Sequence, residues 1–349
     1  MRIKKVVAIY PDYKYLGPSW RTHLWQILVR IETDLGIVGL GYGGGGKAAV
    51  EIVNGHFREL LIDRVINSKE DIKSLWDMLY RESIPYGRKG IVIMGLSGVD
   101  IALWDLLGKA ESVPVYELIG AMTKQRVRAY ATGPDTTWYR DLGFTAHKFS
   151  HKWTGIDSDY DSAFELASKA RNYLGTGALI MIDNYMTWTA VVAIDMAKIL
   201  SDLNIYWFED VLTPDDLVEL SQIRTAIKPI LLAGGEHEFT HHGFSLIANQ
   251  DSYDLWQPDI TWCGGITAGI QIIDLASKYE IPVVPHRGGE IWGLHLIVAS
   301  DCEDLAEVLP GSRGQSQDEI WKDDREFEDG FLTLPTTPGF GVKLNEKLL

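Results

Sequence analysis

Cysteine is scarce in this sequence. Among 349 residues only Cys263 and Cys302 are cysteines. Two cysteines cannot form the disulfide framework that stabilises many secreted domains, and a reducing compartment is the default for such a chain. The first residues, "MRIKKVVAIY", lack the long apolar stretch and the small-residue cleavage site of a secretory signal. We therefore expect a cytoplasmic protein.

Basic residues and long apolar runs are also in short supply. The chain has 33 Lys and Arg residues against 48 Asp and Glu residues, a formal net charge of −15. Nucleic-acid binding needs a basic surface, so we expect no nucleic-acid partner. No unbroken apolar run is long enough to predict a membrane span, so we expect no membrane partner. An acidic protein can still bind an acidic substrate where a metal ion supplies local positive charge.

The first third of the sequence predicts a mixed domain. Residues 24–40 predict two strands joined by a turn at Asp34 to Gly36. Three segments with apolar residues at helical spacing follow. They are residues 48–62, 68–83 and 93–111. A hairpin followed by a cluster of helices is typical of an α+β domain.

From about residue 126 the pattern changes to short apolar strands separated by helical segments. The predicted strands are residues 126–133, 145–151, 178–185, 205–210, 229–236, 253–261, 281–286 and 304–310. Continuous apolar strands are typical of a parallel sheet that is buried on both faces. Eight such strands, each but the last followed by a helix, predict an α/β fold of the TIM-barrel type. A Rossmann-like open sheet is the alternative, but the sequence has no dinucleotide-binding fingerprint.

Carboxylates stand at the ends of three consecutive predicted strands. Asp183 ends the third, Glu209 the fourth and Glu236 the fifth. In a barrel these strand ends meet at one rim, where barrel enzymes have their active sites. Three adjacent carboxylates repel one another unless a cation compensates, and an all-oxygen ligand set favours Mg²⁺ or Mn²⁺ over Zn²⁺. Each acid alone could be salt-bridged or cap a helix, so their succession is what predicts a metal site.

A histidine follows the seventh predicted strand, in "IPVVPHRGGE" (281–290). A single histidine in that position, His286, is more often structural than catalytic. Asp259, one strand earlier, changes this interpretation, because a carboxylate bonded to one ring nitrogen makes the other nitrogen more basic. Glu307 on the eighth strand could hydrogen-bond to a developing oxyanion. We predict that these three residues are catalytic, with His286 as the base.

Five motifs, in this order along the chain, resemble the mandelate racemase branch of the enolase superfamily. They are "MIDNY", "WFED", "AGGEHE", "WQPDITWCGGIT" and "VVPH". Residues 97–121, 130–133 and 338–345 also resemble this branch. The similarity runs from about residue 24 to the end and is closest to acid-sugar dehydratases of the rhamnonate type.

The resemblance implies a modified (β/α)₇β barrel with an α+β capping domain. The capping domain would comprise residues 1–125, with the tail 330–349 packing back on it, and the barrel residues 126–329. It also implies one Mg²⁺ per subunit, a small-molecule sugar acid as substrate, and a homo-oligomer, often an octamer. The implied metal ligands are Asp183, Glu209 and Glu236, and the implied catalytic residues are His286, Asp259 and Glu307.

Further candidates for substrate contact rest on the same resemblance. Lys148 and Lys152 lie four residues apart, so the Lys-x-Lys pair used by racemases of this branch is absent. Lys148 matches a lysine of the rhamnonate-type enzymes and would face the substrate carboxylate, or it could simply extend along the rim. His237 could contact a substrate hydroxyl. Arg21 and His23 lie in "DYKYLGPSWRTHLW" (12–25), a compressed counterpart of a substrate-contacting region.

These features predict a Mg²⁺-dependent dehydratase that acts on an aldonic acid. His286 would remove the C2 proton and the C3 hydroxyl would leave, which yields a 2-keto-3-deoxy acid. His286 returning its proton to the leaving hydroxyl is the economical hypothesis, because no second base is evident. An L-rhamnonate-like substrate is favoured. The alternatives are a dehydratase for arabinonate, fuconate, lyxonate or galactonate, a racemase or epimerase, and a non-catalytic metal-binding scaffold.

Overall fold

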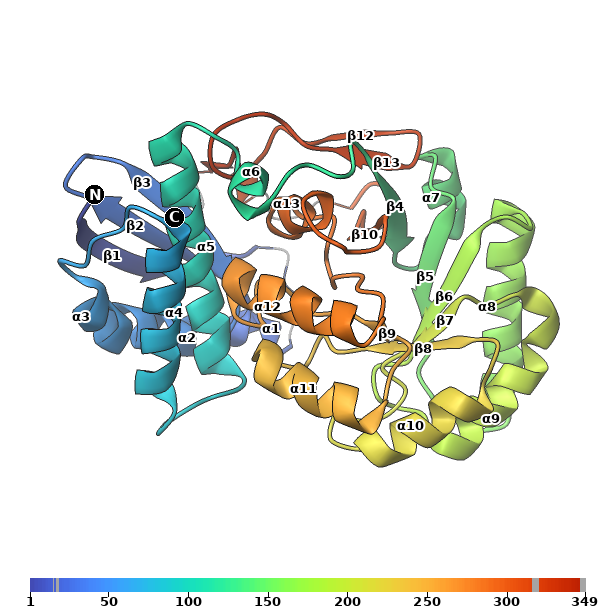
Figure 1. Ribbon diagram of the computed structural model, residues 1–349. Helices are drawn as coiled ribbons and strands as arrows, with labels where there is room; N and C mark the ends of the chain where they lie inside the picture. Colours follow the sequence, from blue (N-terminus) through green and yellow to red (C-terminus); the bar gives the residue numbers. More distant parts are fainter. Residues whose placement is uncertain (15, 17–18, 316–319, 346–349) are drawn as a thin grey trace.

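The computed structural model describes residues 1–14, 16, 19–315 and 320–345. In these residues the chain forms two units, with the N-terminal strands and helices on one side and the barrel on the other (Figure 1). The predicted division near residue 125 falls between helix α6 (Val115–Ile119) and strand β4 (Val127–Thr132).

The N-terminal unit is a three-stranded antiparallel sheet covered by helices. Its strands lie in the order β1 (Ile3–Ile9), β2 (Ile27–Thr33) and β3 (Val38–Gly43). The turn between β2 and β3 contains Gly36 at φ 75°, a conformation that glycine adopts without strain. Besides α6, the helices are α1 (Arg21–Leu24), α2 (Gly46–Ile52), a π-helical turn (Val53–Phe57), α3 (Arg58–Leu61), α4 (Lys69–Ser83) and α5 (Ile91–Glu111).

Helix α5 is the core of this unit. By length and composition it could cross a membrane, but 89% of its most apolar window is buried inside the fold. Alternate glycines of β3 let the helix pack closely, since a Cβ atom at Gly41 would lie 1.9 Å from the carbonyl oxygen of Gly98. The buried Asp105 of α5 accepts hydrogen bonds from the backbone N–H of Leu40 (2.8 Å) and of Phe340 (2.9 Å).

The second unit is a closed parallel barrel. After β4 its strands are β5 (Ala146–Ser150), β6 (Leu179–Asp183), β7 (Trp207–Glu209), β8 (Leu231–Gly234), β9 (Leu255–Trp256) and β10 (Leu305–Val308). The predicted seventh strand is reduced to one parallel bridge, between Val283 and Trp256. Closure comes from the pairing of β10 with β4 and from a 2.9 Å hydrogen bond from Glu303 N to Val283 O. The predicted α/β barrel with an α+β capping domain is therefore confirmed.

Helices surround the barrel and connect its strands (Figure 1). They are α7 (Thr136–Asp141), α8 (Ser158–Leu174), α9 (Ala190–Ile199), a 3₁₀ turn (Ser201–Leu203), α10 (Leu217–Ala226), α11 (Thr240–Gln250), α12 (Gly265–Lys278) and α13 (Ile291–Val298). This arrangement brings the carboxyl ends of the strands to one rim of the barrel.

The C-terminal tail contacts both units. Strand β13 (Phe331–Thr333) pairs with β12 (Glu326–Glu328) and with β4 of the barrel. Further along, Gly339 N donates to Val113 O (3.0 Å), and Gly339 O accepts from Val115 N (2.9 Å) in the N-terminal unit. The short strands β11 (Trp321–Lys322) and β14 (Lys343–Leu344) also pair. Residues 346–349 of the predicted tail lie outside the described residues.

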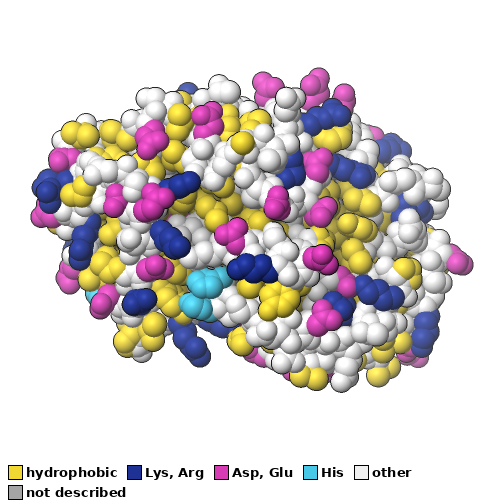
Figure 2. Space-filling view, in the orientation of Figure 1, with side chains coloured by type: hydrophobic (Ala, Val, Ile, Leu, Met, Phe, Trp, Pro, Cys, Tyr) yellow, Lys and Arg dark blue, Asp and Glu magenta, His cyan; other side chains and the backbone are white. Residues whose placement is uncertain are grey.

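Acidic and basic side chains are interspersed over the face of the molecule shown in Figure 2. The net charge of −15 is therefore not gathered into a single acidic region on this face. Both cysteines, Cys263 and Cys302, are buried and unpaired.

Candidate active site

A cavity of about 880 Å³ opens at the carboxyl ends of the barrel strands. The capping domain contributes aromatic side chains to its wall, and the barrel contributes most of the ionisable ones. Among the lining residues are Tyr13, Arg21, Trp25 and Tyr42 from the capping domain and Lys148, Asp183, Tyr185, Glu236, His286, Arg287, Glu290 and Glu307 from the barrel. The cavity thus contains ionisable groups from strands that are far apart in the sequence.

His286 and Asp259 form a hydrogen-bonded pair at the base of the cavity. Their Nδ1 and Oδ2 atoms are 2.8 Å apart. The backbone N–H and the hydroxyl of Thr261 each donate to Asp259 Oδ1, both at 2.7 Å. Burial opposes ionisation of Asp259, but the bond to His286 and the charge of Arg287 outweigh it and lower its pKa. An ionised Asp259 holds the His286 ring with Nδ1 toward Asp259, which leaves Nε2 available to a ligand.

The other ring nitrogen of His286 faces carboxylates. Its Nε2 lies 3.3 Å from Glu236 Oε2 and 3.8 Å from Glu307 Oε2. Burial acts to lower the pKa of His286, but Glu236, Glu307 and Asp259 outweigh it and raise the pKa to about 10. A cation beside Glu236 would offset part of this effect, because it would reduce the negative potential at the ring.

Glu307 is held by three groups. Its oxygens accept hydrogen bonds from Thr132 Oγ1 (2.5 Å) and from the backbone N–H of Arg287 (2.7 Å), and Lys148 Nζ lies 2.9 Å away. Burial opposes ionisation, yet Lys148 and His286 outweigh it and lower the pKa of Glu307 to about 2. An ionised Glu307 only accepts hydrogen bonds, so donation to an oxyanion requires that it first receive a proton.

Lys148 lies between two carboxylates. Its side chain is 1% exposed, and its ammonium group pairs with both Glu209 and Glu307. Burial works against this charge, but the two carboxylates outweigh it and raise the pKa of Lys148 well above its usual value. The residue lines the cavity, and its role as a substrate contact stays a prediction. Its charge, however, is already compensated by protein carboxylates.

The three predicted metal ligands lie at neighbouring strand ends. Asp183 pairs with Glu209 in the register of β6 and β7. Burial and the Glu209 carboxylate together raise the pKa of Asp183 to about 8, and burial also raises that of Glu209. Mutually repelling, buried carboxylates of this kind fit a divalent cation, which prefers oxygen ligands and would relieve the repulsion.

Glu209 has other partners in this structure. Its Oε1 pairs with Lys148, and its Oε2 accepts from Trp207 Nε1 (2.9 Å) and Gln257 Nε2 (2.8 Å). Unlike Asp183 and Glu236, it is not among the residues that line the cavity. Glu209 would therefore have to share or exchange these partners in order to bind a cation.

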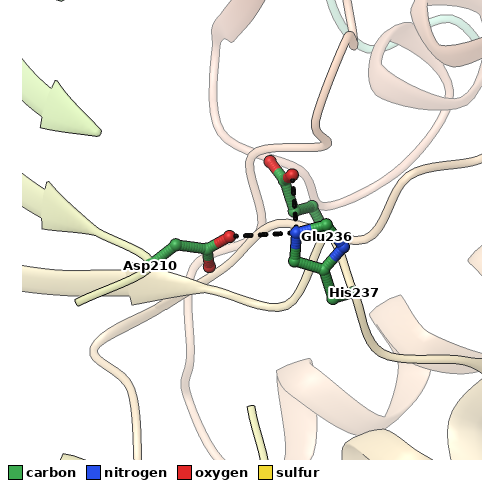
Figure 3. Close-up of side chains that lie close together, drawn as sticks. All are labelled: Asp210, Glu236 and His237. Carbon is green, nitrogen blue, oxygen red and sulfur yellow. Dashed lines mark ion pairs between the residues drawn. The ribbon is translucent and has the colours of Figure 1, made fainter. Parts of the chain in front are cut away.

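A second group of possible ligands lies next to this one (Figure 3). Ligand atoms of Asp210, Glu236 and His237 lie within 4.8 Å of one another. His237 Nε2 is 3.2 Å from Glu236 Oε1 and 3.6 Å from Asp210 Oδ2 (Figure 3). His237 also stacks on Trp262, with 6.1 Å between ring centroids. The predicted substrate contact His237 thus turns to two carboxylates, and it is not among the residues that line the cavity.

The two N-terminal candidates lie differently. Arg21 lines the cavity, with its guanidinium carbon 4.7 Å from the ring centroid of Trp25. His23 is exposed on α1 and is not among the lining residues. Gln26, next to this segment, joins the capping domain to the turn that follows β9. It donates to Thr261 Oγ1 (2.9 Å) and accepts from Trp262 Nε1 (2.8 Å).

Several lining residues were not anticipated from the sequence. Among the aromatic ones are Tyr13, Trp25, Tyr42 and Trp262, and among the charged ones are Arg287, Glu290 and Arg325. The sequence partly indicated the barrel residues, because Arg287 directly follows His286, Glu290 lies four residues after it, and Trp262 lies three residues after Asp259. Tyr13 and Trp25 of the capping domain lie in the segment 12–25 to which the resemblance pointed, but only the docking of the two units shows which of its side chains reach the rim.

A barrel with acidic strand ends under a capping domain defines a class of enzymes with rim active sites. Comparison with known families identifies the group. Residues 21–120 match the mandelate racemase/muconate lactonizing enzyme N-terminal domain, and residues 135–348 match the enolase C-terminal domain-like family. The chain belongs to the mandelate racemase branch of the enolase superfamily, as predicted.

Two curated relatives match nearly the whole chain. A protein of Caldivirga maquilingensis, described as "Putative L-rhamnonate dehydratase", is 33% identical over 98% of this chain and 87% of its own length. The L-rhamnonate dehydratase of Saccharopolyspora erythraea is 30% identical over 98% of this chain and 89% of its own.

Solved structures show the same architecture. L-Rhamnonate dehydratase from Gibberella zeae superposes with a TM-score of 0.88 at 32% identity, covering 99% of this chain and 94% of that one. The 3,6-anhydro-D-galactonate cycloisomerase from Zobellia galactanivorans has a TM-score of 0.87 at 28% identity, covering 99% and 98%. A structure of the Gibberella zeae enzyme complexed with Mg has a TM-score of 0.87 at 30% identity, covering 99% and 95%.

Proposed function

We propose that this protein is a Mg²⁺-dependent dehydratase of an aldonic acid, which removes the C2 proton and eliminates the C3 hydroxyl. The observation that carries this proposal is the His286–Asp259 pair, whose free nitrogen faces the carboxylate of Glu236 at 3.3 Å across the cavity. A base beside a metal ligand is the arrangement needed to remove a proton next to a carboxylate. The two curated relatives are described as an L-rhamnonate dehydratase and a putative one, which supports a hydro-lyase.

The proposed metal ligands are Asp183, Glu209 and Glu236, with one Mg²⁺ per subunit and Mn²⁺ as an alternative. When bound, the cation would stabilise the negative charge that develops on the substrate carboxylate. The mutual repulsion that raises the pKa of Asp183 supports a cation at this place. The Mg-complexed relative supports the choice of metal.

The protein side chains would then carry the proton. Neutral His286 takes the C2 proton at Nε2, and the ionised Asp259 stabilises the resulting imidazolium. The C3–O bond breaks, and His286 returns its proton to the departing hydroxyl, which leaves as water. The resulting enol rearranges to the 2-keto-3-deoxy acid. During these steps Glu307 is ionised and paired with Lys148, and it helps to keep the His286 ring in place.

An L-rhamnonate-like acid is the substrate we favour, because both curated relatives carry that name. Arabinonate, fuconate, lyxonate and galactonate stay open as alternatives. A racemase or cycloisomerase is the second candidate, since one structural relative with a TM-score of 0.87 is a cycloisomerase. Racemisation needs a base on each side of the carbon, and Lys148, the one lysine among the described lining residues, pairs with two carboxylates.

The test is a screen of the purified protein with Mg²⁺ against a set of aldonic and aldaric acids, read as 2-keto acid formation. We expect turnover of L-rhamnonate or a stereoisomer and none by the His286→Asn variant, which should still bind Mg²⁺. Normal turnover by His286→Asn would exclude this mechanism. Proton exchange at C2 without release of water would instead favour the racemase.

A further inference from the structure

An ion pair on the cavity wall has hydrogen-bonding capacity that the protein does not use. Arg287 Nε and Nη2 both donate to one oxygen of Glu290, Oε1, at 2.9 and 2.5 Å. The remaining two atoms, Arg287 Nη1 and Glu290 Oε2, are buried and have no hydrogen-bond partner among the residues that the structure describes. Such groups are costly to leave unpaired, so a ligand that satisfies them gains affinity.

The Arg287–Glu290 pair lies close to His286 and Asp259. Both residues line the 880 Å³ cavity, and Arg287 directly follows His286 in the chain. Arg287 Nη1 lies 3.9 Å from Asp259 Oδ2, beyond hydrogen-bond range. The guanidinium carbon lies 5.3 Å from the ring centroid of Trp25 and 5.8 Å from that of Tyr42. A substrate whose C2 lies at His286 could therefore extend along this wall.

The backbone of Arg287 also indicates a specific role for its side chain. Its φ angle is 54°, in the left-handed region that glycine adopts freely and arginine only with strain. Its side chain is nevertheless 94% buried, since only 6% of it is exposed. The chain thus keeps a large cationic residue where glycine would be easier, which fits a requirement for the guanidinium itself.

The charges of the pair define the kind of ligand group. Arg287 and Glu290 compensate each other, so the pair has no net attraction for an anion. Its unused capacity is one donor and one acceptor, which matches a hydroxyl group because a hydroxyl both accepts and donates. A carboxylate at the same place would meet the negative Glu290.

We propose that Arg287 and Glu290 bind a hydroxyl of the sugar acid beyond C3, and that they select a monoacid over the corresponding diacid. This inference rests on the proposed function, whose substrate class it narrows. Arg21 lies on the same wall and is the cation that would bind a second carboxylate, since among the described residues it has no carboxylate partner. A diacid held by Arg21 would reverse the selection.

The experiment compares three ligands by calorimetry with Mg²⁺ present, and by kcat/KM where turnover occurs. They are L-rhamnonate or the active aldonate, the hexaric acid that matches it from C2 to C5, and 2,3-dihydroxybutanoate, which lacks the distal hydroxyls. The wild-type protein should prefer the aldonate over the diacid by about tenfold or more. Equal or tighter binding of the diacid by the wild type would overturn the inference.

Two variants shift the selection in opposite directions. Glu290→Gln removes the closer of the two carboxylates that compensate the Arg287 charge, so binding of the diacid should strengthen relative to the aldonate by about tenfold. Arg287→Gly fits the backbone conformation and leaves Glu290 unpaired, so it should weaken the diacid further. Glu290→Gln should not change the affinity for 2,3-dihydroxybutanoate, whereas a merely structural defect would lower all three affinities. An unchanged preference in both variants would overturn the inference.

The calorimetric comparison keeps the two proposals separate. Binding with the predicted selection but without 2-keto acid formation would refute the dehydratase and retain the selectivity of the wall. Dehydration of aldonate and diacid at equal efficiency would retain the dehydratase and refute the role of Arg287 and Glu290.

Discussion

His286 Nδ1 lies 2.8 Å from Asp259 Oδ2, and the opposite ring nitrogen faces Glu236 at 3.3 Å. The carboxylate of Asp259 thus orients the His286 ring, and Thr261 in turn fixes that carboxylate by two hydrogen bonds. Replacing that carboxylate by an amide would keep the shape and remove the charge.

Asp259→Asn should lower kcat by about a hundredfold or more, because the imidazolium formed in the reaction loses its counter-charge. The base must be neutral to act, so the rate rises with pH through the pKa of His286. Asp259 is one of the groups that raise this pKa, so in the variant the rise should move to lower pH. The measurement is a pH profile of kcat/KM. Asp195→Asn, at a half-buried surface site on α9, is the control, and an unshifted profile would contradict the pairing.

Lys148→Met should have opposite effects on stability and on metal binding. Without the ammonium group, Glu209 and Glu307 become buried charges without a counter-ion, and breaking such a pair costs about 3–5 kcal/mol. The metal-free variant should therefore unfold at lower denaturant concentration than the wild type. Mg²⁺ binding should become tighter, because a cation that competes for Glu209 has been removed. Lys198→Met, on the surface, is the control, and weaker Mg²⁺ binding by Lys148→Met would argue against this competition.

The stability of the metal-free protein should fall as the pH rises. Burial and Glu209 raise the pKa of Asp183 to about 8, above its usual 3.8, so the folded state holds this proton more tightly than the unfolded state. That contribution is complete below about pH 4 and is lost progressively up to about pH 8, at no more than about 1.4 kcal/mol per pH unit. Melting temperatures in EDTA and in Mg²⁺ at several pH values would test this. A metal-free protein that gains stability over this range would contradict the prediction.

Variants of two adjacent residues, Glu209 and Asp210, can distinguish the two groups of possible metal ligands. If Asp183, Glu209 and Glu236 hold the ion, Glu209→Gln should weaken Mg²⁺ binding by about tenfold or more, and Asp210→Asn should leave it close to the wild-type value. The measurement is a Mg²⁺ titration by calorimetry, with melting curves to verify folding. The reverse order would assign the ion to Asp210, Glu236 and His237, whose ligand atoms lie within 4.8 Å of one another.

The barrel could be predicted from local pattern, because strands that are buried on both faces must be continuously apolar. The rim acids followed from that pattern, since the last residue of each parallel strand reaches the same edge. The seventh strand shows the limit of this reasoning. Residues 281–286 have the expected composition, yet they make one bridge, at Val283, because pairing depends on the neighbouring strand and not on the segment itself.

The partners of the rim residues could not be predicted. Glu209 is at the expected strand end, but Lys148, Trp207 and Gln257 engage its oxygens. His237 follows the third predicted ligand, yet it turns to Glu236 and Asp210. Side-chain direction at a strand exit depends on the local backbone angles and on charges from other strands, and a linear pattern contains neither.

The sequence by itself determined the class of fold, the order of acids and histidine along the rim, and the family, because each depends on residues one strand–helix unit apart. Only the tertiary structure decided which aromatic side chains of the capping domain enclose the cavity. It also decided that Arg287 and Glu290 leave one donor and one acceptor unused on the wall. The physical reason is that pairing and burial are properties of groups brought together from distant parts of the chain.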